Sequence, residues 1–246
     1  MPRATSYHRP TTIEGAVTLL AAQDHMALAG GTILNADDDP TPVAMVDLQG
    51  LGLTDMESGA DRIRLGAMVT LDNLKSDDRV PDSVRDAARA ELPSTLRTLA
   101  TVGGTVAVGD PDSVLLAALL VHAAEVHVAG PDGTGGAPLA NVLRSNGPCH
   151  GHLITAVSLT TGGTTVCESV GRTPADTPIV SATGRYLDGV TTVALTGVAS
   201  TPVLIDPGDP TSGLEPLGDF RGSADYRLHL ASVLTDRILA SLKDAS

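Results

Sequence analysis

The sequence predicts an α+β fold, and three observations carry this prediction. Apolar residues recur at helical spacing over about 12–22, where Thr11 and Glu14 stand in the pattern of a capping box. Short strand-like runs, broken by glycine-bearing turns, begin near Leu153 and predict an antiparallel sheet. Helical spacing returns from about Ala224 and predicts a terminal amphipathic helix.

Residues 1–50 form the first predicted unit. Two short apolar strands, over 26–29 and 43–48, follow the first helix and predict a small β-α-β arrangement. The acidic run over 37–40 lies between these strands and ends in proline. Such a run is typical of a solvated loop rather than of a metal site.

Residues 51–157 and 158–246 form the second and third predicted units. A glycine-bearing connection over 51–59 marks the boundary to the second unit, and Pro131-Asp132-Gly133 predicts a hairpin turn within it. The expected helices of the second unit cover about 70–76, 82–90, 94–100 and 114–124, and its expected strands cover 62–65 and 125–128. The later strands are expected over 153–159, 179–187 and 191–198.

The composition favours a folded chain that binds neither nucleic acid nor a membrane. Of its 246 residues, 42% are hydrophobic and only 2% are aromatic, so stacking surfaces for bases are few. The formal net charge of −13 argues against nucleic acid and anionic membranes, because such binding relies on clustered Lys and Arg. The chain has neither an apolar stretch of about eighteen residues nor a secretory signal pattern, so we expect a cytoplasmic protein.

The chain offers few residues for metal or covalent chemistry. Its two cysteines, Cys149 and Cys167, match neither a CxxC metal site nor an iron–sulfur run, so any cluster must lie on another chain. Two free thiols are favoured over a disulfide, although a disulfide stays open. His150 and His152 lack distant partners, so loop histidines are favoured over a metal pair or a general base. We expect no metal site, and the catalytic residues stay unknown.

Two glycine pairs are the main candidates for a binding site. Gly30-Gly31 and Gly103-Gly104 each follow an apolar stretch and precede a threonine. Glycine lets the backbone approach a phosphate closely and leaves its N–H exposed to an oxyanion. The pairs therefore predict two turns that hold one pyrophosphate, whereas two ordinary strand-end turns are the alternative.

A series of segments in a fixed order resembles the FAD-binding medium subunit of molybdenum hydroxylases, the xanthine dehydrogenase and carbon monoxide dehydrogenase flavoprotein family. The resemblance covers nearly the whole chain. It implies a two-subdomain FAD-binding fold of the PCMH/vanillyl-alcohol-oxidase type, followed by an antiparallel sheet with a helix like the C-terminal domain of CO dehydrogenase flavoproteins. The segments are YHRPTTIEGA (7–16), LAGGT (28–32), VDL (46–48), IRLGA (63–67), TVGG (101–104), VHVAGPDG (126–133), DTPIVSA (176–182) and DYRLHL (225–230).

The same resemblance implies a cofactor site. The FAD pyrophosphate would lie between the two glycine turns, with the N–H groups of residues 30–34 and 102–105 as donors. The expected cofactor-binding residues are Ala29, Gly30, Gly31, Thr32, Ile33, Leu34, Gly66, Ala67, Thr101, Val102, Gly103, Gly104, Thr105, Asp110 and Leu153.

Two positions near the second glycine turn depart from the family pattern. Thr105 stands where the family usually has Asn, and Val114 stands where it has an Asp that binds the adenosine end. Asp110 and Asp112 lie nearby, either as substitutes for that Asp or as acids that cap the next helix.

Two further departures concern the flavin ring. The segment 147–152 is contracted, and Cys167-Glu168-Ser169 replaces an expected lysine and aromatic residue. The resemblance therefore implies an altered ring environment beside an intact phosphate clamp.

The function that the resemblance implies is electron relay. An FAD-binding subunit of a molybdenum hydroxylase complex passes electrons from iron–sulfur clusters to an external acceptor, and its partners are an iron–sulfur small subunit and a molybdenum-binding large subunit. Two alternatives stay open: a stand-alone FAD-dependent oxidoreductase with an organic substrate, and a flavin-free structural subunit on the same scaffold. No Ser-His-Asp or nucleophile-elbow pattern supports hydrolysis.

Overall fold

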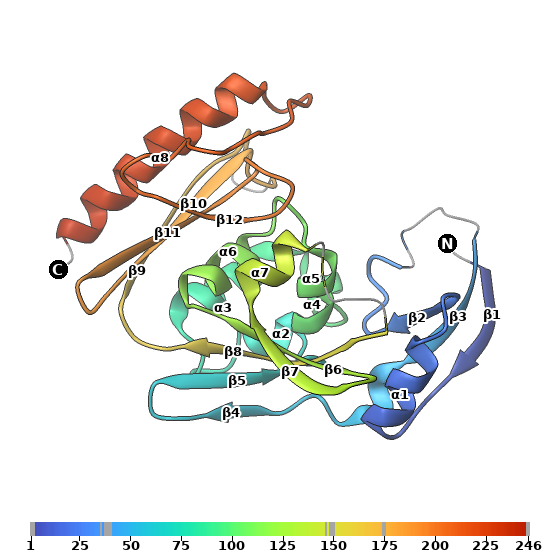
Figure 1. Ribbon diagram of the computed structural model, residues 1–246. Helices are drawn as coiled ribbons and strands as arrows, with labels where there is room; N and C mark the ends of the chain where they lie inside the picture. Colours follow the sequence, from blue (N-terminus) through green and yellow to red (C-terminus); the bar gives the residue numbers. More distant parts are fainter. Residues whose placement is uncertain are drawn as a thin grey trace.

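The computed structural model describes residues 3–34, 36, 41–145, 147, 151–173 and 176–244. Its strands form three sheets, which follow one another along the chain from the N-terminal to the C-terminal end of the molecule (Figure 1). The fold is mixed α and β, with an antiparallel sheet and a long helix at its C-terminal end, as the sequence predicts.

The first sheet is parallel, with β3 (Pro42–Asp47) between β1 (Arg3–His8) and β2 (His25–Leu28). The helix α1 (Ile13–Leu20) packs on it through Ala16, Val17 and Leu20. Its N-cap is Thr12, whose hydroxyl accepts the Gly15 N–H, so the cap lies one residue after the predicted position.

The second sheet is antiparallel and has the order β4 (Met56–Ser58), β5 (Arg62–Gly66), β8 (Leu153–Thr160), β6 (Glu125–Gly130) and β7 (Gly133–Pro138). The run predicted over 153–159 therefore belongs to this sheet, and the assignment of that run to the C-terminal sheet is wrong. The predicted division into 1–50, 51–157 and 158–246 stays a prediction, although β8 itself continues to Thr160.

Short helices cover one side of the second sheet (Figure 1). The helix α6 is hydrophobic all round, and its residues from Leu115 to Val121 are all buried. Such a helix needs neighbours on every side. The helices are η1 (Leu48–Leu51), α2 (Leu71–Leu74), α3 (Asp82–Glu91), α4 (Ser94–Arg97), α5 (Val102–Val108), α6 (Val114–Val121) and α7 (Leu139–Arg144).

The third sheet lies between α6 and the long helix α8 (Ala224–Asp244). Its order is β12 (Val203–Ile205), β11 (Val190–Thr196), β10 (Val180–Leu187) and β9 (Thr164–Val170), all antiparallel. At Gly184 a Cβ would come 2.2 Å from Ile238 Cγ2, so the missing side chain lets α8 approach β10 closely.

Arg185 joins the third sheet to the second. Its side chain is 3% exposed and donates to Gly162 O at 3.0 Å, Thr160 Oγ1 at 2.6 Å and Thr161 O at 2.6 Å. A buried guanidinium is costly unless its donors are satisfied, so these bonds fix β10 against the end of β8.

Candidate functional site

The first glycine turn follows β2 and packs on the backbone that precedes the second turn. A Cβ at Gly30 would lie 1.8 Å from Leu99 O and 2.5 Å from Leu99 C. Gly31 has φ +69°, a left-handed conformation that side chains other than glycine adopt at a cost. The sequence therefore needs glycine at both positions, for close approach at Gly30 and for backbone conformation at Gly31.

The backbone N–H groups of the first turn, residues 30–34, have no acceptor among the described residues. The turn is closed by Ala36 N–H donating to Ile33 O at 2.9 Å. Residues 29–32 and Leu34 are half-buried, whereas the Ile33 side chain is exposed. Successive backbone N–H groups that are not bonded within the protein can bind an anion, so an anion site at this turn stays a prediction.

The second glycine turn is the first turn of α5, and its N–H groups already have partners. Gly103 N–H donates to Ala67 O at 2.9 Å, and Gly104 N–H donates to Thr101 Oγ1 at 3.1 Å, so Thr101 is the N-cap. Val102 N–H donates to Val69 O and Thr105 N–H to Thr101 O, each at 2.9 Å. In this conformation the N–H groups of residues 102–105 are bonded within the protein, and their donation to a phosphate stays a prediction.

Close packing explains two of the glycines that the sequence assigned to the site. A Cβ at Gly103 would lie 2.7 Å from Ala67 Cβ and 2.9 Å from Ala67 O. A Cβ at Gly66 would lie 2.3 Å from Leu53 O. At these positions glycine lets two backbone segments meet, which is a structural role, and contact of Gly66 and Ala67 with a cofactor stays a prediction.

Leu153 and Asp110, the remaining predicted site residues, lie in different surroundings. Leu153 is buried in the core under α1, beside Ala129 and Leu20. Asp110 is exposed, and its Oδ1 accepts the Asp112 N–H at 2.8 Å. The helix α6 is capped by Ser113, whose Oγ accepts the Leu116 N–H, so neither aspartate is its N-cap.

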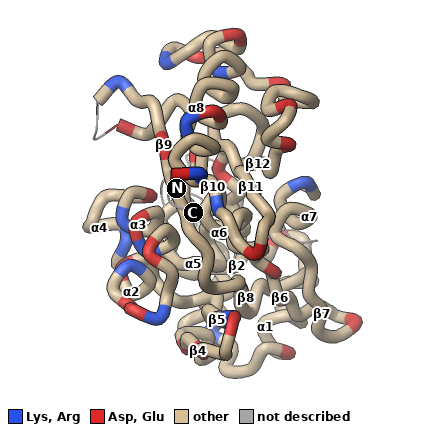
Figure 2. The backbone as a smooth tube through the Cα atoms, turned by 90° about the vertical axis from the view of Figure 1, so that its left-hand side faces the viewer, with Lys and Arg blue, Asp and Glu red and all other residues tan. Residues whose placement is uncertain are grey.

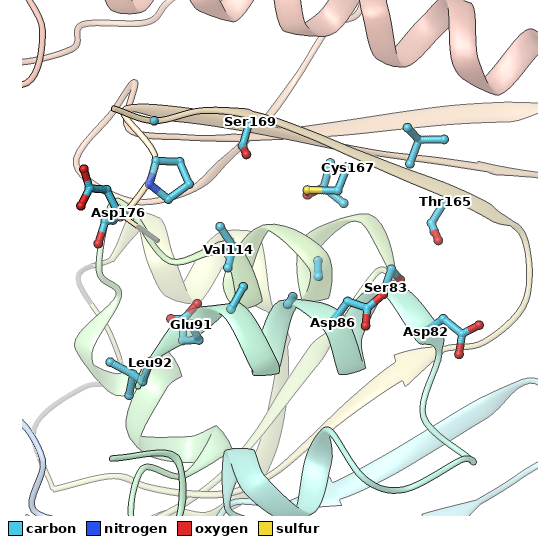
Figure 3. A pocket seen from close by; sticks show the side chains of 18 of the residues that line it. Asp82, Ser83, Asp86, Glu91, Leu92, Val114, Thr165, Cys167, Ser169 and Asp176 are labelled. Carbon is cyan, nitrogen blue, oxygen red and sulfur yellow. The ribbon is translucent and has the colours of Figure 1, made fainter. Parts of the chain in front are cut away.

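A large cleft lies between helices α3 and α6 on one side and β9 with residues 171–173 and 176–178 on the other (Figure 3). Its volume is about 1140 Å³. Val114 lines the cleft from α6, and Cys167 and Ser169 line it from β9. Two departures from the family pattern, which lie more than fifty residues apart in the sequence, thus meet in one cleft.

Glu91, which no sequence pattern indicated, also lines this cleft. Its Oε2 accepts the Leu115 N–H at 2.9 Å and so joins the end of α3 to the start of α6. Removal of the carboxyl group from water raises its pKa to about 7. A sequence pattern could not identify it, because its partner lies on another helix.

A serine–histidine pair on the cleft wall has the geometry of a nucleophile and its base. Ser83 Oγ lies 2.8 Å from His122 Nε2, and His122 Nδ1 lies 2.7 Å from Thr160 O. Burial, together with the Arg185 guanidinium, lowers the pKa of His122 to about 4. An imidazole of such low basicity is a poor proton acceptor, so the pair has a structural role and supports no hydrolysis.

The charges near the cleft are mostly paired. Around α2 and α3, basic and acidic positions alternate along the chain (Figure 2). Arg89 pairs with Asp86 at 2.5 Å, and Arg172 Nε lies 3.5 Å from Asp176 Oδ2; of these residues Asp86, Arg172 and Asp176 line the cleft. Among the described residues, no group of three His, Cys, Asp or Glu side chains is arranged to hold a metal ion. The run 37–40, Cys149 and His150 lie outside the described residues.

A family model described as the FAD binding domain in molybdopterin dehydrogenase matches residues 3–160. The chain belongs to this family. The match covers all the predicted site residues, both glycine turns and one wall of the cleft. Within the described part of the chain, no helix has the length and hydrophobicity needed to cross a membrane.

Comparisons over the full length agree with this assignment. The chain is 27% identical to the uncharacterized protein YgfM of Escherichia coli K12, covering 97% of this chain and 96% of YgfM. It is 27% identical to the carbon monoxide dehydrogenase medium chain of Afipia carboxidovorans, and the match covers 99% of this chain and 98% of that one. A chain of the reconstituted CO dehydrogenase from Oligotropha carboxidovorans superposes with a TM-score of 0.90 at 25% identity and full coverage of both. Quinoline 2-oxidoreductase from Pseudomonas putida 86 shares the fold, with a TM-score of 0.86 over 98% of each chain at 23% identity.

Proposed function

We propose that this chain is the FAD-binding electron-relay subunit of a molybdenum hydroxylase complex. In this role it holds FAD noncovalently and passes electrons from iron–sulfur clusters to an external acceptor. Its partners are an iron–sulfur small subunit and a molybdenum-binding large subunit, and its expected location is the cytoplasm. The observation that carries the proposal is the first glycine turn, where the N–H groups of residues 30–34 have no acceptor among the described residues.

The described residues fit a pyrophosphate group at the first turn. Backbone donors need no ionisable side chain, so an acidic protein can bind a dianion through them. Gly30 brings the turn against Leu99 O, and Gly31 supplies its left-handed conformation. Bound FAD would supply the redox chemistry. The residues of the chain bind and orient it.

The division of work between chains supports the complex. Electron relay needs a donor cluster, and the sequence has only two cysteines, which is too few for an iron–sulfur cluster with four cysteine ligands. The relatives include a chain called medium, which by its name is one of several chains.

One observation favours a second candidate, a flavin-free structural subunit. The N–H groups of residues 102–105 are all bonded within the protein, and Val114 offers no polar atom to the cleft. A chain that lost its cofactor would retain the packing roles of Gly66 and Gly103.

A spectrum and a titration decide between the candidates. The purified chain is examined for flavin absorbance and is then titrated with FAD, FMN and riboflavin, with fluorescence quenching as the readout. The proposal predicts that FAD binds most tightly, because riboflavin has no phosphate for the first turn and FMN has only one. A chain that is colourless and quenches none of the three is the flavin-free subunit.

Co-expression tests the complex. The chain is produced with molybdenum-binding and iron–sulfur chains from the same genome. One stoichiometric assembly in size-exclusion chromatography supports the relay. A chain that runs alone and oxidises an organic substrate with its own flavin contradicts it and supports the stand-alone oxidoreductase.

A further inference from the structure

The segment 214–226, which leads into α8, exposes three large apolar side chains. Leu217 is 88% exposed, Phe220 is 85% exposed and Tyr226 is 41% exposed. Phe220 is the only phenylalanine of a chain that has no tryptophan and three tyrosines. A core would gain most from this side chain, and its exposure beside two other large apolar side chains is typical of a protein interface.

The turn that carries Phe220 has a fixed conformation. Pro216 is buried and anchors the approach to the turn. Asp219 Oδ1 accepts the Arg221 N–H at 2.9 Å and the Gly222 N–H at 3.0 Å. Asp219 N–H donates to Gly222 O at 3.0 Å and closes the turn. These bonds lie on the inner side of the turn and leave the Phe220 ring in solvent.

Two arginines tie the same turn to the body of the protein. Arg221 Nε lies 2.8 Å from Asp219 Oδ2, and Arg221 Nη2 lies 2.6 Å from Asp112 Oδ2. Arg227 is buried, and its Nη2 lies 2.9 Å from Asp219 Oδ1. A surface that is already ordered loses little conformational freedom when a partner binds. The network therefore prepares Phe220 for a contact outside the chain.

A small cavity lies beside Phe220. Its volume is about 320 Å³, and Arg172, Thr177 and Ile179 are among the residues that line it. The Arg172 guanidinium carbon lies 5.5 Å from the centre of the Phe220 ring. The surface thus offers a projecting aromatic side chain and a recess next to it, and interfaces use both for their anchor residues.

The free charges around this surface are acidic. Glu215, Asp225 and Asp209 are exposed, and among the described residues no basic side chain pairs with any of them. Arg172 and Arg221 have acidic partners. A partner with Lys and Arg around an apolar recess complements such a surface. A second copy of this chain, which has a net charge of −13, would bring like charges together.

We propose that Leu217, Phe220 and Tyr226 form the docking surface for the molybdenum-binding large subunit, with Phe220 in an apolar recess bordered by Lys and Arg. The inference rests on the proposed function, since the partner is a chain of that complex. The first glycine turn follows a strand of the first sheet, whereas the docking surface lies on the third sheet, at the opposite end of the molecule (Figure 1). An iron–sulfur chain has to approach the cofactor, so the surface at the other end fits the remaining partner.

Photo-crosslinking in the assembled complex tests what covers the surface. The chain is co-expressed with the molybdenum-binding and iron–sulfur chains, with p-benzoylphenylalanine in place of Phe220 or, as the control, of Val190. Val190 is 62% exposed. It lies in the β10–β11 hairpin, whereas Ile179 at the docking surface precedes the other end of β10. Mass spectrometry should show position 220 joined to a segment of the large subunit that is rich in Lys and Arg, and no product from position 190.

Substitutions measure how much the surface contributes to binding. The partner chains are co-expressed without this chain, and its binding to them is followed by biolayer interferometry. Phe220→Ser and Leu217→Ser should each weaken binding about tenfold, whereas Val190→Ser should not change it. Glu215→Lys should slow association about threefold and reduce its salt dependence, whereas Asp236→Lys, at an exposed position of α8, should change neither. All variants should bind FAD like the parent and melt at the same temperature.

The other results overturn the assignment in distinct ways. A crosslink from position 220 to the iron–sulfur chain, or to a second copy of this chain, shows that a different partner covers the surface. If position 220 gives no crosslink, or if Phe220→Ser and Leu217→Ser bind like the parent, the surface is not a docking site, while assembly of the parent leaves the proposed function standing. If the parent joins neither chain, the proposed function is wrong and the docking assignment is wrong with it.

Discussion

The two glycine turns have the same sequence, Gly-Gly-Thr, and opposite hydrogen-bonding states. The turn at 30–32 follows a strand and, among the described residues, its N–H groups have no acceptor. The turn at 103–105 starts a helix, so its N–H groups bond to Thr101 and to the 67–69 backbone. The difference teaches that the same three residues can leave their N–H groups without described acceptors after a strand, and can use them for capping and packing at the start of a helix.

The largest expected effect is at Gly103. Replacement by Val places a side chain 2.7 Å from Ala67 Cβ and 2.9 Å from Ala67 O, where backbone has to move. Overpacking of this kind costs about 3 kcal/mol in the free energy of unfolding. Urea unfolding measures the loss, and Gly135→Val is the control because nothing lies within 4 Å of a Cβ there. If both variants unfold at the parent's midpoint, the claim that the second turn packs closely on Ala67 is wrong.

The next effect is the contribution of Glu91, in the cleft, to the free energy of unfolding, which should depend on pH. Because Glu91 has a pKa of about 7 in the folded chain against 4.5 in the unfolded chain, its contribution to stability falls as the pH rises from about 4.5 to 7. Glu91→Gln removes this fall. The free energy of unfolding of the variant should therefore rise by about 1–3 kcal/mol relative to that of the parent across that range.

The quantity to measure is the difference in the free energy of unfolding between the parent and Glu91→Gln. His122, whose pKa is lowered to about 4, makes stability rise over about pH 4 to 6.5 in both proteins and cancels in the difference. Chemical unfolding at half-unit steps of pH gives the difference. Parallel stability curves would show that the Glu91 carboxyl is not buried as described.

A pair of threonine substitutions gives the smallest effect. Thr101→Ala removes the N-cap of α5 and should cost about 1 kcal/mol, whereas Thr32→Ala at the other turn should cost almost nothing. Thr101→Ser keeps the capping oxygen and should restore most of the loss. Thermal unfolding of the three variants checks this order, and equal losses at Thr101 and Thr32 would contradict the assigned difference between the turns.

The short helices α5 and α7 were not predicted. The sequence predicts the other α-helices and the central strands well because their apolar periodicity is strong. The buried α6 and the amphipathic α8 are examples, and the hairpin at 131–132 has the expected turn residues. The edge strands β1, β4, β7, β9 and β12 were not predicted. The described side chains of β1 are mostly exposed, and those of β9 alternate between exposed and half-buried, so neither has a strong apolar pattern.

The candidate site could be predicted only in part. The glycine pairs mark positions where the chain needs a residue without Cβ, but the same need arises for packing at Gly103 and for φ at Gly31. Glu91 and Arg221 depend on partners distant in the sequence, at Leu115 and Asp112, and no local spacing indicates such pairs. Tertiary structure decides which polar groups form hydrogen bonds within the protein and which remain available to a ligand.

The central claim is that the first turn, through its open N–H groups, binds the cofactor. Its most direct test is a titration of FAD into Gly31→Ala and Gly213→Ala. Both glycines are left-handed, with φ of +69° and +70°, so each substitution adds a similar backbone strain of about 1–2 kcal/mol. We predict that Gly31→Ala weakens FAD binding at least tenfold while Gly213→Ala binds like the parent, with similar melting temperatures for the two FAD-free variants. Equal affinity of both variants and the parent for FAD would contradict the claim.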